Sequence, residues 1–344
     1  MKRQVWHPGL NRNIVIGGCK LPKHDPVGLK LKDFLHLAYP PAPATIDYSA
    51  KALSVIENIE GNDTLGDCVI AEDAHFIGVV TGNANTLFSY SSSQVISDYS
   101  KIAGYIPGEP ATDQGTDPTT DLNYRVKVGY ADGSKDAGWA LVDATNQGEV
   151  EYAINTFGNL KMWFGIPDSI VNSMPSSSGF VWDVTAGSPD QNNGHCIGSP
   201  GYNVPKILTV PITAQGVGVM TWGMLGLVTW KALASWFVPS AGGGLAVRVT
   251  TDWLNKTSGV APSGLNLQAL VTGFNSYFDG SIPVPIPTPA PAPTPSPAPG
   301  PLVVTLAEAQ SWATAGIGGG FPLLTRAQAE ADASAGLAAN WPKS

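Results

Sequence analysis

The chain has 344 residues, of which 43% are hydrophobic and 13% are charged, and its formal net charge is −8 at pH 7. This composition supports a sizeable folded core and excludes a chain that is disordered throughout. The acidic balance and the lack of a basic run exclude nucleic-acid binding as the main role.

The N-terminus does not have the pattern of a secretory signal. Met1-Lys2-Arg3 is a basic start, but the polar residues Asn11 to Asn13 arrive before any apolar run, whereas a signal peptide needs one of about 7–15 residues. No stretch of roughly 18 apolar residues follows, so we expect no membrane span. The sequence leaves two locations open: the cytoplasm, or a larger particle, such as a virion, that carries the protein.

The pattern along the chain predicts helices first and strands later. Residues 1–42 are interrupted by prolines and are expected to form an irregular N-terminal arm. Hydrophobic spacing predicts helices after Cys68 and over 91–103 and 147–157, and a short amphipathic element over 122–130. It then predicts strands over 160–166, 195–202, 206–213, 217–222 and 244–250, with a short helix over 230–237. This segregation indicates an α+β domain over 43–280, with a helical half packed against an antiparallel sheet half.

The composition changes sharply after this domain. Prolines occupy every second position from Pro283 to Pro301, which no helix or central strand accommodates. Residues 281–301 are therefore predicted to be a stiff linker. Residues 302–344 carry two capping boxes, which begin at Thr305 and Thr325, and are predicted to form a small helical module. So short a segment makes a poor independent core, so we expect it to dock on a protein partner.

Cys68 is the first candidate for chemistry. It follows the turn Gly66-Asp67 and opens an apolar, helix-like run. The helix dipole and free N–H groups at a helix N-terminus favour a thiolate, which is the nucleophilic form of cysteine. A buried cysteine that only fills the core is the alternative. The chain has three cysteines, an odd number, which argues against a disulfide framework.

His195 is the histidine best placed to act with Cys68. It follows the polar turn 192–194 and begins a predicted strand. An imidazole beside a thiol takes its proton and later returns it to the leaving group. His75 lies about two helical turns beyond Cys68, too far along the axis to pair with it directly. The other histidines are expected to be hydrogen-bonded structural residues.

The order of these features resembles the papain-like cysteine peptidases. Residues 43–48 are similar to the entry of that family's mature domain, and Asn62 stands six residues before Cys68, where the family has a glutamine. His195 lies roughly 130 residues after Cys68, close to the family's spacing. The resemblance covers about residues 43–253. Two further matches are the Gly-His and Gly-Tyr pairs at 194–195 and 201–202, and Thr-Trp-Gly at 221–223 for the family's Asn-Ser-Trp-Gly.

The resemblance implies a papain-like fold and a cysteine peptidase or amidase that acts on peptides or cell-wall peptides. Cys68 would attack, His195 would carry the proton and Thr221 would orient the imidazole. Asn62 and the Cys68 N–H would hold the oxyanion. Neither a cofactor nor a metal ion is expected, because the aspartates at 113, 117 and 121 lack the spacing of a calcium loop.

Three departures from the family pattern favour a second hypothesis. Asn62 is one methylene shorter than glutamine, Val69 replaces the family's tryptophan, and Thr221 stands where an asparagine orients the histidine. The alternative is a catalytically inactive papain-like fold that serves as a structural or binding protein, for example in a phage particle. For an active pair, we expect the Cys68 sulfur within about 4 Å of a His195 nitrogen. Cys196 is then expected to face away from the cleft.

Overall fold

The computed structural model describes residues 2–22, 26, 28–34 and 42–250. The predicted linker over 281–301 and the predicted helical module over 302–344 lie outside these residues, as does the end of the main domain. The described part has an α+β fold, in which most strand pairs are antiparallel. It contains no helix long and apolar enough to cross a lipid bilayer.

A nine-stranded sheet forms the centre of the described part. Its order is β3-β5-β13-β6-β8-β11-β12-β7, and β4 pairs with β8 at the side. Only β3–β5 and β7–β12 are parallel pairs in this sheet. The strands are β3 (Leu29–Lys30), β4 (Ile46–Asp47), β5 (Asp136–Val142), β6 (Leu160–Gly165), β7 (Phe180–Trp182), β8 (Gly194–Tyr202), β11 (Gly216–Thr221), β12 (Met224–Thr229) and β13 (Gly244–Thr250).

Local sequence signals fix the ends of several helices. Ser91 closes a capping box at the start of α3, and Asp117 caps α4, which begins at Pro118. Gly104 and Gly158 end α3 and α5 in the left-handed conformation. The α-helices are α1 (Leu53–Ile56), α2 (Cys68–Asn83), α3 (Ser92–Ala103), α4 (Pro118–Lys127), α5 (Gln147–Phe157), α6 (Asp168–Asn172) and α7 (Trp230–Trp236).

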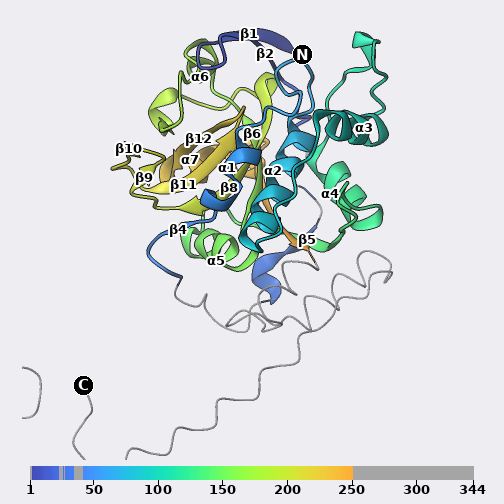
Figure 1. Cartoon of the computed structure of the whole chain (residues 1–344). Coiled ribbons are helices and arrows are strands. Elements are labelled where there is room, and N and C mark those ends of the chain that lie inside the picture. The colour runs from blue at the N-terminus through green and yellow to red at the C-terminus, as the bar shows by residue number, and fades with distance from the viewer. Residues whose placement is uncertain (1, 23–25, 27, 35–41, 251–344) are drawn as a thin grey trace, which may run out of the picture. The chain divides into compact units, whose positions relative to one another are not determined.

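Alternation along the strands divides the core into two main clusters. On β6, Trp163 packs with residues of α2, α3 and α4, whereas Phe164 packs with residues of α5 and α7. Neighbouring residues in a strand point to opposite faces of the sheet, which explains the division. Figure 1 shows α2 in front of the sheet with α3 and α4 beside it. The helix that begins with Cys68 therefore belongs to one cluster, and Trp222 of the β11–β12 turn belongs to the other.

Several predicted elements need correction. The arm over 1–42 is not irregular throughout, because β1 (Arg3–His7) and β2 (Arg12–Ile16) form an antiparallel hairpin. The predicted strand over 206–213 is instead a hairpin of β9 (Lys206–Ile207) and β10 (Val210–Pro211). Most of the short amphipathic element predicted over 122–130 lies in α4, which begins earlier, at Pro118, and ends at Lys127. Strands β5, β7 and β12 were not predicted.

Candidate active site

Cys68 is the first residue of α2, and only 2% of its surface is exposed. Burial raises the pKa of its thiol to about 12, although the backbone N–H of Cys196 and the Lys161 ammonium act in the opposite direction. The helix N-terminus alone favours a thiolate. Because the loss of hydration on burial outweighs the effect of the helix N-terminus, the Cys68 thiol is neutral at pH 7.

The turn before Cys68 is held by buried polar contacts. Gly66 N–H donates to the carboxylate of Asp113, 3.1 Å away, and the Tyr99 hydroxyl donates to the same group. Asn62 Nδ2 donates to Asp67 Oδ1 at 3.1 Å, and burial raises the pKa of Asp67 well above its usual range. The amide that the sequence assigns to the oxyanion thus makes a hydrogen bond within the turn.

His195 is oriented by its neighbours on β11. Its Nε2 lies 2.7 Å from Thr221 Oγ1, the geometry expected from the Thr-Trp-Gly motif. The Trp222 ring stacks on the imidazole, with centroids 4.2 Å apart and planes inclined by 12°. Burial lowers the pKa of His195 to about 3, so the ring is neutral at pH 7.

The turn between β11 and β12 explains why Trp222 covers the imidazole. Thr221 pairs with Met224, which leaves Trp222 and Gly223 as a two-residue loop. Their φ angles are +48° and +73°, as a type I′ hairpin turn requires. A left-handed conformation is uncommon for tryptophan. Here it places the indole against His195, and the His7 ring also packs on Trp222, with ring centroids 5.6 Å apart and planes inclined by 69°.

The structure brings the side chains of His195 and Thr221 into contact. For Cys68, the described contact with this part of the chain is with Cys196, the residue that follows His195 on β8. The Cys68 thiol lies beside the backbone N–H of Cys196. Within the described residues, no hydrogen bond joins the Cys68 and His195 side chains. Cys196 lies on the opposite face of β8 from His195, as expected, but this face packs in the same cluster as Cys68 and Cys19, so Cys196 does not point away from Cys68. All three cysteines are free and buried.

A group of buried charges supports α2 directly behind Cys68. Lys161 of β6 donates to Val69 O at 2.8 Å and to Asp73 and Asp121 at 2.7 Å each. Sequence reasoning missed this group, although the acidic pair at 72–73 inside an apolar helix was a usable signal. We call it the α2 ion network, and it consists of Glu72, Asp73, Asp121, Arg125, Lys161 and Arg248.

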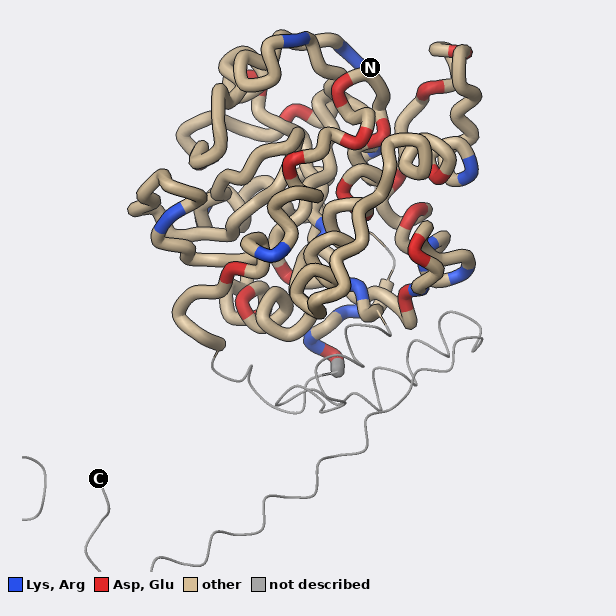
Figure 2. Tube along the Cα trace, in the orientation of Figure 1, with Lys and Arg blue, Asp and Glu red and all other residues tan. Residues whose placement is uncertain are grey.

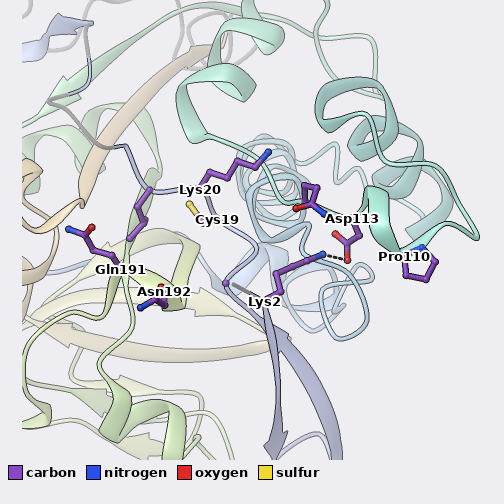
Figure 3. A pocket seen from close by; sticks show the side chains of 10 residues that line it. Lys2, Cys19, Lys20, Pro110, Asp113, Gln191 and Asn192 are labelled. Atoms are coloured by element: carbon purple, nitrogen blue, oxygen red, sulfur yellow. Dashed lines mark ion pairs between the residues drawn. The ribbon is translucent and has the colours of Figure 1, made fainter.

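A polar cavity of about 570 Å³ lies beside the turn that precedes Cys68. Asp113 lines it, and Gln191 and Asn192 line it from the turn that precedes His195 (Figure 3). Lys2 also lines the cavity and forms an ion pair with Asp113, shown as the dashed line in Figure 3. The described residues contain no cluster of side chains suited to holding a metal ion.

No protein-family model matches the chain, and no curated protein sequence matches it either. The chain resembles solved structures of papain-like cysteine proteases in its fold. Procathepsin L 3 from the larval midgut of Tenebrio molitor is 13% identical, with a TM-score of 0.45 over 67% of this chain and 76% of that one. Xylellain, a cysteine protease from Xylella fastidiosa, is 11% identical, with a TM-score of 0.47 over 72% and 98%. Procathepsin B S9 from Trypanosoma congolense is 13% identical, with a TM-score of 0.46 over 71% and 92%.

Proposed function

We propose that this protein is a thiol hydrolase of peptide or related amide bonds, with Cys68 as nucleophile and His195 as general base. The observation that carries the proposal is the position of Cys68 at the N-terminus of α2, beside the backbone of the residue that follows His195. The imidazole is itself oriented by Thr221 and covered by Trp222. A thiol, a neighbouring base and a group that orients the base are the parts that nucleophilic catalysis requires.

The chemistry follows from those parts. His195 accepts the Cys68 proton while sulfur attacks the substrate carbonyl carbon, giving a tetrahedral oxyanion. The Cys68 N–H and the Asn62 amide are the proposed donors to that oxyanion, once Asn62 turns from Asp67. The imidazolium then protonates the leaving amine, and the C–N bond breaks to leave a thioester. Water, deprotonated by His195, hydrolyses the thioester and restores the free thiol.

The resting state of the two groups favours a second candidate function. Cys68 and His195 are each only 2% exposed, and burial keeps the thiol and the imidazole both neutral. Asn62 is engaged by Asp67. These observations suit an inactive fold that serves as a structural or binding protein. The predicted docking of residues 302–344 on a partner, such as a virion protein, remains a proposal for either function.

Thiol alkylation separates the two candidates. Because Cys68 is buried and neutral at rest, its labelling by iodoacetamide below pH 7 is expected to be slow and to proceed through hydrated states of the site; we expect this labelling to fall at least tenfold in His195→Ala, because a thiol without a base is mostly protonated there. His75→Ala is the matched control, since His75 is also buried and neutral but lies on α2 and bonds to Asn58 O. Peptide mass mapping identifies the labelled cysteine. Labelling of Cys68 that ignores His195→Ala refutes the hydrolase proposal and leaves the binding protein.

A further inference from the structure

Lys161 of β6 lies where α2 meets the central sheet. Its ammonium donates to Val69 O at 2.8 Å, and Val69 follows Cys68 in the first turn of α2. Lys161 and Trp163 are alternate residues of β6 and therefore share one face of the sheet. Trp163 packs in the same cluster as Cys68. Lys161 thus reaches the start of α2 from the face of the sheet on which Cys68 lies.

The ammonium of Lys161 keeps its charge although the side chain is fully buried. Burial alone lowers the pKa of an ammonium, but the carboxylates around Lys161 raise its pKa above the usual value. These carboxylates belong to Asp121, Asp73 and Glu72. Three hydrogen bonds, to Val69 O, Asp73 and Asp121, use the full donor capacity of the ammonium. Both the position and the charge of Lys161 are therefore fixed.

Helix stability alone does not explain a cation at this end of α2. The positive end of a helix dipole lies at the N-terminus, where carboxylates are stabilising and cations are not. Only 13% of the residues are charged, and Figure 2 shows most of the tube in the colour of uncharged residues, so abundance does not explain it either. A negative charge that develops on Cys68 is a group for which this placement is favourable.

The titratable groups near the Cys68 thiol come from several segments. Burial has the largest effect on the pKa of Cys68 and raises it; among the charged groups, Asp67 raises this pKa and Lys161 lowers it. The thiols of Cys19 and Cys196 are also near, and burial raises the pKa of each so far that both are neutral at pH 7. Among these groups, Lys161 supplies the positive charge.

We propose that Lys161 is a positioning residue for the Cys68 nucleophile and serves it in two ways. Its hydrogen bond to Val69 O holds the first turn of α2 against the sheet. Its fixed charge stabilises the thiolate that forms when water enters the site. This role rests on the proposed function, because it concerns the ionised nucleophile that His195 is proposed to generate. Lys161 transfers no proton and acts through the helix turn and through its electric field at the sulfur.

The test compares two cations of the α2 ion network in the full chain. Lys161→Met removes the ammonium that bonds to the first turn of α2 behind Cys68. Arg125→Met is the matched control, because it removes another buried cation from the same network. The hydrogen bonds of Arg125 within the described residues go to Asp73, Asp98 and Gly129 O, beyond that first turn. The rate of iodoacetamide labelling of Cys68 is measured against pH, and peptide mass mapping identifies the cysteine.

The shape of the pH profile separates positioning from a general loss of stability. A less stable fold opens more often, so labelling of Cys68 becomes faster by a similar factor at every pH. Loss of a positive charge near the sulfur instead moves the pH of half-maximal labelling, because the thiolate is the reactive form. We expect this midpoint to rise by at least about half a pH unit in Lys161→Met. In Arg125→Met it should match the parent.

Far-UV circular dichroism establishes that each variant is folded. If Lys161→Met does not fold, a charge-balanced pair of double variants replaces the two single ones. Lys161→Met with Asp121→Asn removes one charge of each sign, and Arg125→Met with Asp121→Asn is then the control. An unchanged midpoint in the folded Lys161 variant, or an equal rise in the control, overturns the positioning role.

The same series in a His195→Ala background separates this role from the proposed function. Because Lys161 acts from behind α2, the rise of the midpoint should be retained there. A retained rise, with labelling that is otherwise insensitive to His195→Ala, would support the effect of Lys161 on the thiol and refute the hydrolase proposal. A tenfold fall in His195→Ala, with no rise in Lys161→Met, would leave the hydrolase proposal standing and overturn the role of Lys161.

Discussion

The side of the site behind Cys68 and the side around His195 are stabilised in different ways. Behind Cys68, charged groups are removed from water and satisfied by one another, and Lys161 alone lies within 3.1 Å of three carboxylates. Around His195 the described contacts are the Thr221 hydroxyl and the stacked Trp222 ring, with no ion pair. Although burial alone raises the pKa of Asp73, the cations around it hold that pKa below its usual value. His195 has no such partner, so burial alone decides its charge.

The comparison teaches that burial has opposite consequences on the two sides. In the α2 ion network, a buried charge remains charged because opposite charges lie at hydrogen-bonding distance. At His195, a titratable group without a counter-charge becomes neutral. The network therefore holds the start of α2 in place. The His195 imidazole stays neutral and can accept a proton once water enters the site.

The largest change in the free energy of unfolding is expected from disruption of the α2 ion network. Lys161→Met removes one cation from three buried carboxylates, so we expect the free energy of unfolding to fall by about 3–5 kcal/mol. Urea denaturation measures the change. Lys231→Met is the control, because Lys231 is exposed on α7, and its effect should stay within about 0.5 kcal/mol. A loss as small as the control's would mean that the network contributes no net stability.

On the uncharged side, a smaller effect is expected from the hydroxyl. Thr221→Val keeps the shape of the side chain but leaves His195 Nε2 without its partner, which should cost about 2 kcal/mol of stability. Thr221→Ser retains the hydroxyl and should recover most of that loss. Equal losses in the two variants would assign the effect to packing and remove the orienting role of Thr221.

The smallest effect concerns pH and His7. Burial lowers the pKa of His7 from 6.5 to about 4, so between these values the unfolded chain binds a proton that the folded chain does not. Stability from this group is therefore present above pH 6.5 and is lost as the pH falls. His7→Phe should gain roughly 1.5 kcal/mol relative to the parent between pH 7 and pH 5.

Urea unfolding at several pH values measures the His7 effect as a difference between variant and parent. The exposed neighbour Trp6 supplies the control, since Trp6→Phe changes an aromatic ring of the same hairpin without a titrating group. A constant difference between His7→Phe and the parent across this pH range would show that His7 does not link the hairpin to acid.

Local signals predicted the α+β class and the elements whose ends carry strong caps. The helix over Gln147–Phe157 was predicted with its observed bounds, because Gly158 ends it in the left-handed conformation. The contact of Thr221 with His195 was also expected, since a motif on one strand fixed which residue faces the next. The hairpin β1–β2 was not predicted, because its strands are short and polar residues alternate irregularly with apolar ones.

The sequence by itself determined which groups were available: a thiol at a helix start, a histidine at a strand start, and a Thr-Trp-Gly turn. Tertiary structure decided their state. Cys68 is neutral because it is buried, and its helix terminus does not compensate for the lost water. Cys196 turned toward α2, and Gly18 met Gly66, through contacts between segments far apart in the chain. Such contacts depend on how the elements pack, and neither spacing nor composition records that packing.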